Sequence, residues 1–144
     1  MTGEYLVAAQ LHRLNILGTI TYGNSKKADV IAFSERTNFY ISIEVKSSSK
    51  GKWHIGNCVP EPSDKLWIFV HIPYKIEDAP EFFVMTQEDI HRELKDSENQ
   101  YLERYRLKHG NEYGNKPGFA SMKIEIARKY CNQWSKIISR LNEN

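Results

Sequence analysis

The sequence predicts an α/β domain in which a mixed central sheet is flanked by helices. Three observations carry this prediction: an amphipathic helix at the N-terminus, two short apolar runs separated by a polar break, and an uncharged apolar run at 66–72. A run of the last kind is typical of a strand that is buried on both faces, as in the middle of an α/β sheet. The length of 144 residues fits one domain with one sizeable core.

The first element is expected to be a helix that is capped by Thr2 and ends at about Leu14. Its apolar side chains follow helical spacing. Glu4 lies at the N-terminal end of this apolar face, where an acidic side chain favours the helix dipole. A strand at 17–22 and a turn at 23–27 are expected to follow.

Two further strands are predicted at 30–33 and 39–45, because both runs are apolar and a short polar break separates them. The second run alternates between apolar and polar residues, so Glu44 and Lys46 share one face of the strand. Asp29 precedes the first run. If the two strands form a hairpin, Asp29, Glu44 and Lys46 meet at one end of the sheet.

Such a group has two interpretations. Two neighbouring carboxylates suit a hard divalent cation such as Mg²⁺, with Mn²⁺ as a substitute, and a nearby lysine can hold an attacking water or developing negative charge. The same residue types also occur on a solvated sheet face as a simple cross-strand charge pair.

The order of these residues resembles the PD-(D/E)XK nuclease superfamily, in which an Asp is followed on the next strand by Glu-x-Lys. Here the motif residues are Asp29, Glu44 and Lys46, and Ala28 stands where the family usually has proline. The N-terminal segment GEYLVAAQLHRLN is similar to the first helix of the branch that includes archaeal Holliday junction resolvases, and Glu4 matches the glutamate of that helix.

This resemblance implies a restriction-endonuclease-like fold with an αβββαβ core, and metal-dependent hydrolysis of DNA phosphodiester bonds. It implies that Asp29, Glu44 and the backbone carbonyl of Val45 bind Mg²⁺, that Glu4 assists from the first helix, and that Lys46 orients the water or offsets charge in the transition state. A catalytically silent module that binds nucleic acid or a protein partner is the alternative. The substrate stays open between linear DNA, branched DNA, a specific site and RNA.

Residues 50–64 do not fit the helix that this fold places after the motif strand. The stretch contains two glycines and two prolines, so we expect a loop, or at most one helical turn at 53–57. Trp53 within it either packs in the core or stacks on a base.

The rest of the chain is expected to form strands at 66–72 and 82–85, helices at 86–94, 96–108 and 120–141, and a loop at 109–119. Thr86 is a typical N-cap, because an acidic first turn follows it. We therefore predict one domain with a core at 1–95 and a helical extension at 96–144 that packs on it. The apolar stripe of the last helix offers a homodimer surface as an alternative to core packing.

Charge is unevenly distributed along the chain. Residues 1–60 and 104–144 carry an excess of basic side chains, whereas residues 61–103 carry four Lys and Arg against eleven Asp and Glu. The basic flanks can meet a phosphate backbone, which makes DNA the expected partner. The candidate phosphate contacts are Lys26, Lys27, Ser47, Ser48, Lys50, Lys52 and Lys116.

The compartment is expected to be the reducing cytoplasm, because the two cysteines lie far apart and no signal peptide is evident. No apolar run approaches the ~18 residues that a membrane-spanning helix needs.

Overall fold

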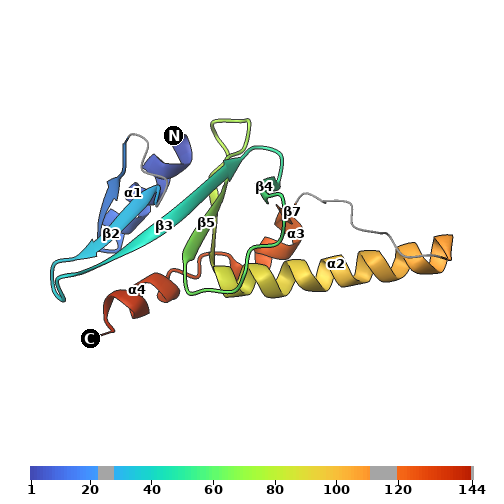
Figure 1. Ribbon diagram of the computed structural model, residues 1–144. Helices are drawn as coiled ribbons and strands as arrows, with labels where there is room; N and C mark the ends of the chain where they lie inside the picture. The colour runs from blue at the N-terminus through green and yellow to red at the C-terminus, as the bar shows by residue number, and fades with distance from the viewer. Residues whose placement is uncertain (23–27, 111–119, 144) are drawn as a thin grey trace.

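A computed structural model of the chain describes residues 1–22, 28–110 and 120–143 (Figure 1). The elements in chain order are α1 (Thr2–Arg13), β1 (Leu17–Ile20), β2 (Val30–Ser34), β3 (Phe39–Ser48), β4 (Lys52–Gly56), β5 (Leu66–His71), β6 (Glu81–Thr86), α2 (Gln87–His109), β7 (Ala120–Lys123), α3 (Ile124–Ala127), the 3-10 helix η1 (Arg128–Tyr130) and α4 (Ser135–Leu141).

Five of the strands form a mixed sheet in the order β1-β2-β3-β5-β6, and β4 and β7 form a separate antiparallel pair. Strands β1 to β3 run up and down through two antiparallel pairings, β5 lies parallel to β3, and β6 is antiparallel to β5. The register pairs Val30 with Ile43 across β2 and β3, and Glu44 with Trp67 across β3 and β5.

Each face of the large sheet carries its own apolar core. The first face is covered by α1 and α4, and its core includes Val7, Leu11, Ile43, Val45, Ile68, Val70, Val84, Ile137 and Leu141. The second face is covered by the start of α2, the β4–β7 pair and the α3–η1 segment, and its core includes Trp53, Trp67, Phe69, Phe83, Met85, Ile90, Leu94, Met122 and Tyr130. The predicted α/β fold with a mixed sheet between helices is therefore confirmed.

Strand β5 shows why the sequence predicted a central strand that is buried on both faces. All of its residues from Leu66 to Val70 are buried, and alternate side chains enter the two cores. A strand with apolar neighbours on both faces has no polar side to present, which gives the uncharged run that the sequence analysis singled out.

The segment between β3 and β5 differs from the predicted core. In the described chain it contains strand β4 and no helix, so the helix expected after the third strand of an αβββαβ core is absent there. Trp53 belongs to the core: its side chain is 2% exposed, its indole nitrogen donates to the Val70 carbonyl at 3.1 Å, and its ring packs against Phe69 and Phe83. Base stacking by Trp53 is thereby excluded in this arrangement.

The C-terminal region corrects two predictions. The predicted helices 86–94 and 96–108 form one helix, α2, which begins at the Thr86–Asp89 capping box and ends at Gly110 in the left-handed conformation (φ 71°). The predicted helix 120–141 is divided into β7, α3, η1 and α4, so the extension 96–144 is not wholly helical. The break between η1 and α4 contains Asn132, which adopts a positive φ of 54° and whose amide donates to the Phe82 carbonyl at 2.9 Å.

Among the described residues, none of the helices combines the length and the apolar character that crossing a membrane requires. Both cysteines, Cys58 and Cys131, are exposed free thiols.

Candidate functional site

The predicted site residues lie on the elements that the sequence analysis assigned to them. Glu4 is in the first turn of α1, Asp29 immediately precedes β2, and Glu44 and Lys46 are in β3. The hairpin of β2 and β3 brings Asp29 beside Glu44, because Val30 pairs with Ile43 and the next residues outward are these two.

Asp29 is fixed against β3 on both sides of Glu44. Its backbone amide donates to the Ile43 carbonyl at 3.1 Å, and its carboxylate oxygen Oδ2 accepts from the Val45 amide at 2.8 Å. On the other side, the Asp29 carbonyl accepts from the Thr21 amide at 3.0 Å. The Asp29 carboxylate thus accepts the hydrogen bond that a backbone carbonyl would accept in a longer β2. Its other oxygen, Oδ1, receives no hydrogen bond within the described chain.

Glu44 lies between two lysines. Its Oε2 is 2.9 Å from the Lys65 ammonium and its Oε1 is 3.8 Å from that of Lys46. Both lysine side chains are 36% exposed, whereas that of Glu44 is 19% exposed. The Lys65 ammonium also lies 5.4 Å from the centre of the Trp67 ring. In this arrangement the charge of Glu44 is balanced, and Lys65 is its nearer partner.

Lys65 is the residue of this group that sequence reasoning missed. It immediately precedes β5, and β5 is paired in parallel with β3 so that Glu44 faces Trp67. The sequence does show that Lys65 is a cation directly before a buried strand. Linking it to Glu44 requires the β3–β5 register, which the sequence does not contain.

Glu4 approaches β3 from the other face of the sheet. Helix α1 packs on the side of Val45, and Gly3 lies so close to β3 that an added Cβ would be 2.8 Å from the Ser47 Cβ. Glu44 and Lys46 lie on the side of Trp67. The Glu4 oxygen Oε2 is buried without a hydrogen bond, and the N-terminal ammonium lies 3.0 Å from it.

The donors at this end of the sheet fit a hard cation in their chemistry. Asp29 and Glu44 supply carboxylates from adjacent strands, and such oxygens are the ligands that Mg²⁺ prefers while it keeps several waters. Across residues 1–22, 28–110 and 120–143, however, no group of three or more His, Cys, Asp or Glu side chains is gathered closely enough to hold a metal ion. A cation would therefore bind through Asp29 and Glu44 first, in competition with Lys65.

The candidate phosphate contacts divide into two sets. Lys26, Lys27 and Lys116 lie outside the described residues. Ser47, Lys50 and Lys52 are exposed, and the partly buried Ser48 hydroxyl accepts from the Lys50 amide at 3.0 Å. Lys52 of β4 is paired with Lys123 of β7, and both are exposed. Like charges opposite one another destabilise a sheet, so this position favours an anion.

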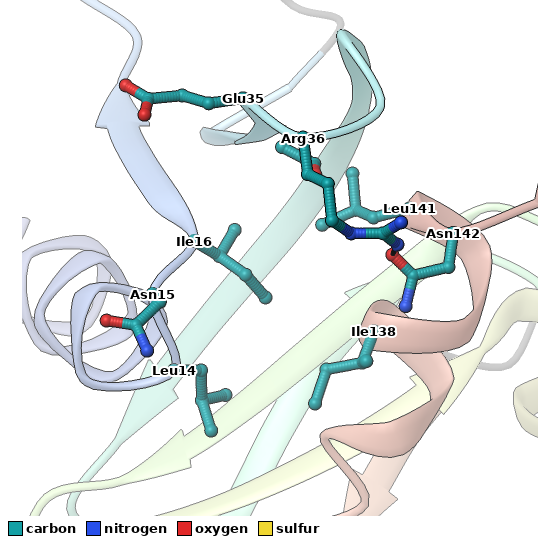
Figure 2. A pocket seen from close by; sticks show the side chains of 9 residues that line it. Leu14, Asn15, Ile16, Glu35, Arg36, Ile138, Leu141 and Asn142 are labelled. Carbon is teal, nitrogen blue, oxygen red and sulfur yellow. Dashed lines mark hydrogen bonds between the residues drawn. The ribbon is translucent and has the colours of Figure 1, made fainter.

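A pocket of about 410 Å³ lies elsewhere, between the end of α1, the β2–β3 turn and α4 (Figure 2). Its lining consists of Leu14, Asn15, Ile16, Ser34, Glu35, Arg36, Ile138, Leu141 and Asn142. Hydrogen bonds from Arg36 to Asn142 and from the Thr37 hydroxyl to the Leu141 carbonyl join the turn to α4. None of the predicted site residues lines this pocket.

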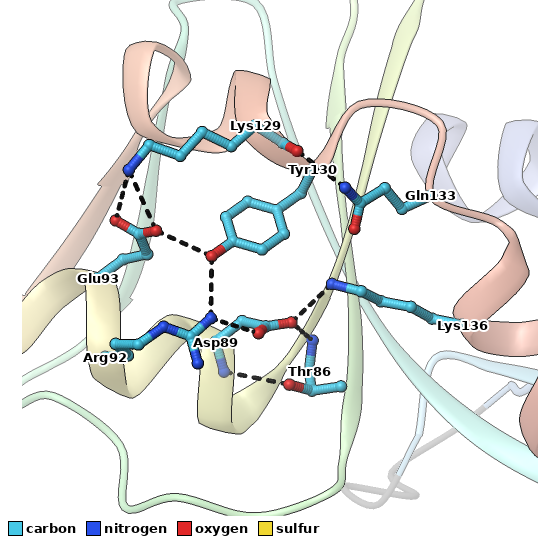
Figure 3. A network of polar contacts seen from close by, with 8 residues as sticks. All are labelled: Thr86, Asp89, Arg92, Glu93, Lys129, Tyr130, Gln133 and Lys136. Atoms are coloured by element: carbon cyan, nitrogen blue, oxygen red, sulfur yellow. Dashed lines mark hydrogen bonds and ion pairs between the residues drawn. The ribbon is translucent and has the colours of Figure 1, made fainter.

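A second group of charged residues, the Asp89–Glu93 network, joins α2 to the C-terminal segment (Figure 3). Asp89 accepts from the Thr86 amide at 2.9 Å and from Lys136 and Arg92 at 2.8 Å each. Burial alone would raise the pKa of Asp89, but the hydrogen bonds from Lys136, Thr86 and Arg92 together lower it to about 2.

Glu93 completes this network. It accepts from the Tyr130 hydroxyl at 2.8 Å and forms an ion pair with Lys129 at 3.1 Å. Burial is the main reason that the pKa of Tyr130 is raised, which keeps the hydroxyl protonated as a donor. The network therefore connects α2 to η1 and α4, and each of its two carboxylates has at least one cationic partner.

The fold and these contacts define an α/β protein with a mixed five-stranded sheet and a carboxylate–lysine group at the β2–β3 end. No protein-family description matches the chain, and no curated protein matches it significantly.

Proposed function

We propose that this protein is a metal-dependent endonuclease of the restriction-endonuclease-like type that hydrolyses DNA phosphodiester bonds. The observation that carries the proposal is the position of Asp29 beside Glu44. The Asp29 amide donates to the carbonyl of Ile43, and its carboxylate accepts from the amide of Val45, the two residues that flank Glu44. Lys46 follows Glu44 by two residues on the same strand. This is the arrangement of residue types that the sequence motif implies.

In this proposal Asp29 and Glu44 would hold Mg²⁺, with the Val45 carbonyl as a further ligand. Glu4 of α1 lies on the other face of the sheet, so it would assist only from the end of the strand. The bound ion lowers the pKa of a water and stabilises charge on the phosphoryl oxygens. Lys46 shares a face of β3 with Glu44 and has a partly exposed side chain, so it can orient the water and offset transition-state charge.

The surroundings of β3 support a polyanionic substrate. Ser47, Lys50 and Lys52 follow the motif along the chain, and Lys123 joins them through the β4–β7 pair. Cations placed beyond the cleavage residues can hold the phosphate backbone without reading its sequence. DNA is the substrate that we favour, and the same contacts would accept RNA.

The second candidate is a nucleic-acid-binding module that does not cut. Two lysines balance the charge of Glu44, and the described residues contain no group of three potential metal ligands. Both observations are compatible with a site that has lost its metal. All four residues of the motif are present, which favours the enzyme.

The test is to incubate the purified protein with supercoiled plasmid and with a synthetic four-way junction, in Mg²⁺, Mn²⁺ or EDTA. The Lys46→Ala variant is compared with Lys95→Ala, which removes an equally basic side chain from an exposed pair on α2. The proposal predicts metal-dependent cutting that Lys46→Ala loses and Lys95→Ala keeps. Equal cutting by both variants, or binding to DNA without cutting in any metal, contradicts it.

A further inference from the structure

The loop that joins β5 to β6, residues 72–80, presents two apolar side chains to solvent. Tyr74 is 80% exposed and Ile76 is 96% exposed, which are the highest values among the large apolar side chains described. The Asp78 amide donates to the Lys75 carbonyl at 3.1 Å and closes a turn around Ile76. Single exposed apolar residues are common on proteins, but two of them on one turn offer a small apolar surface to a partner.

An apolar pocket lies at the other end of the sheet. It is the pocket of about 410 Å³ between α1, the β2–β3 turn and α4, and its volume is in the range of pockets that take up ligands. Leu14 and Ile138 line it and are 36% and 37% exposed, so part of their apolar surface is open to an incoming side chain. Ile16 and Leu141 supply buried parts of its wall.

The charges at the loop and at the pocket are complementary. In the loop, Lys75 and Glu77 flank the exposed tip. At the pocket, the side chains of Glu35 and Arg36 extend in different directions, and Arg36 is directed towards Asn142 (Figure 2). The Arg36 guanidinium donates to the Asn142 side chain with one of its several N–H groups. Within the described chain, none of the charged side chains of these two surfaces forms an ion pair with an oppositely charged group.

The loop and the pocket lie at opposite ends of β3, so they cannot meet within one molecule. Phe39 begins β3 beside the turn, and Ser48 at its end pairs with His71, after which the loop begins. The ten residues of β3 span about 33 Å. Figure 1 shows the same separation, with the β5–β6 loop at the top and the β2–β3 turn and α4 at the lower left. A contact between this loop and this pocket therefore requires two copies of the chain.

We propose that copies of this chain associate head to tail, with the β5–β6 loop of one copy inserted into the pocket of the next. Ile76 enters the pocket between its apolar walls. Glu77 pairs with Arg36, and Lys75 pairs with Glu35. Because the two contact surfaces differ, the association continues as a chain, closes into a ring, or closes as a two-fold pair that uses both loops. This association does not depend on the proposed nuclease activity.

Other occupants fit the two surfaces less well. Glu77 and Asp78 repel phosphates, which argues against nucleic acid as the partner of the loop. A small molecule would fill the pocket but leave the apolar tip of the loop uncovered. A second copy covers both surfaces and matches the charges of both.

The contact is expected to be weak. Two inserted side chains bury far less than the ~800 Å² per partner of a standard interface, so we expect a dissociation constant of about 0.1–1 mM. Association is therefore measured by sedimentation equilibrium at protein concentrations from about 20 μM to about 1 mM.

The central comparison is Ile76→Asp against Leu107→Asp. Both changes place the same charge on an exposed apolar position, so both variants should fold. Leu107 belongs to α2, which contributes neither to the loop nor to the pocket. Ile76→Asp should weaken the association at least about tenfold, because no apolar side chain then fills the pocket. Leu107→Asp should associate like the wild type.

Charge reversal tests which side chains meet. Arg36→Glu and Glu77→Arg should each weaken the association about threefold, and the double variant should recover it, because the pair is restored with opposite polarity. Arg104→Glu is the control, since it reverses an exposed arginine on α2, and it should have no effect.

Amide NMR spectra locate the contact. In the wild type, the signals of residues 14–16, 72–80 and 138–142 should shift as the protein concentration rises, and in Ile76→Asp they should stay in place. A protein that remains monomeric up to about 1 mM would overturn the inference. So would equal association of Ile76→Asp and the wild type, a double variant that does not recover, or concentration-dependent shifts confined to other surfaces.

Discussion

Two groups of carboxylates in this molecule face lysines, and they differ in how completely their oxygens are satisfied. In the Asp89–Glu93 network, the carboxylate of Asp89 accepts three hydrogen bonds, from Lys136, from Arg92 and from the Thr86 amide. At the β2–β3 end, Glu44 is paired with Lys65 at 2.9 Å and lies 3.8 Å from the Lys46 ammonium, but Asp29 accepts a hydrogen bond on one oxygen alone, from the Val45 amide. A carboxylate that is already saturated holds structure together, whereas one with free oxygens can take up a cation.

The largest expected effect separates these two roles. Asp29→Asn should reduce metal-dependent cleavage at least about 10²-fold, because a neutral amide is a poor ligand for Mg²⁺. The fold should persist, since the asparagine oxygen can still accept from the Val45 amide. Cleavage rates and thermal unfolding of the variant and the wild type provide the measurement. Cleavage close to the wild-type rate would remove Asp29 from the site.

The second prediction concerns Asp89, whose removal should affect the stability of the fold. Asp89→Ala should lower the free energy of unfolding by about 2–3 kcal/mol, because it removes the carboxylate that accepts from the Thr86 amide in the capping box and leaves the Lys136 ammonium without its partner. Urea unfolding measures this change, with Asp96→Ala as the control, since Asp96 is exposed on the same helix. A loss below about 0.5 kcal/mol would show that the network does not anchor α2.

The third prediction concerns acid. The pKa of Asp89 is about 2 in the folded protein against 3.8 for an unperturbed aspartate, so the unfolded state binds the proton more readily. The stabilisation is therefore fully present above about pH 4 and is lost as the pH falls towards 2. Asp89→Asn should flatten the dependence of stability on pH within this window, as measured by urea unfolding at successive pH values. If the stability of Asp89→Asn depends on pH as that of the wild type does, groups other than Asp89 are responsible for the loss of stability in acid.

The smallest expected effect is at Lys65. Lys65→Met keeps an unbranched side chain but removes the ammonium that lies beside Glu44 and over the Trp67 ring. We expect less than about 1 kcal/mol change in stability, because the lysine of the pair is partly exposed to solvent, which screens the attraction. Affinity for Mn²⁺ should rise several-fold, since a competing positive charge is gone. Lys95→Met is the matched control, and weaker metal binding in Lys65→Met would contradict the competition.

The parts of the molecule that sequence could predict are those that local patterns determine. The alternation along β3 sets the faces of Glu44 and Lys46, the apolar run of β5 indicates a buried strand, and Thr86 with Asp89 begins α2. Asp29 was expected near Glu44 because the start of one strand of a hairpin lies beside the end of the other.

The parts that sequence could not predict depend on contacts between distant segments. Strand β4 is stabilised by its pairing with β7, about seventy residues later in the chain. Because the sequence does not reveal this partner, Gly51 and Gly56 predicted a loop instead of a strand. Residues 120–123 have an apolar pattern that also suits a helix, and only the partner strand decides between the two. Lys65 meets Glu44 for the same reason, through the parallel register of β3 and β5.

The most direct test of the contrast between the two carboxylate groups is a calorimetric titration of the protein with Mn²⁺, which does not depend on finding the substrate. The comparison uses the wild type, Glu44→Gln and Glu93→Gln, because each variant neutralises one lysine-facing glutamate. We predict that the wild type and Glu93→Gln bind Mn²⁺ alike and that Glu44→Gln loses this binding. Equal binding by all three proteins, or none by the wild type, would contradict a cation site at Asp29 and Glu44.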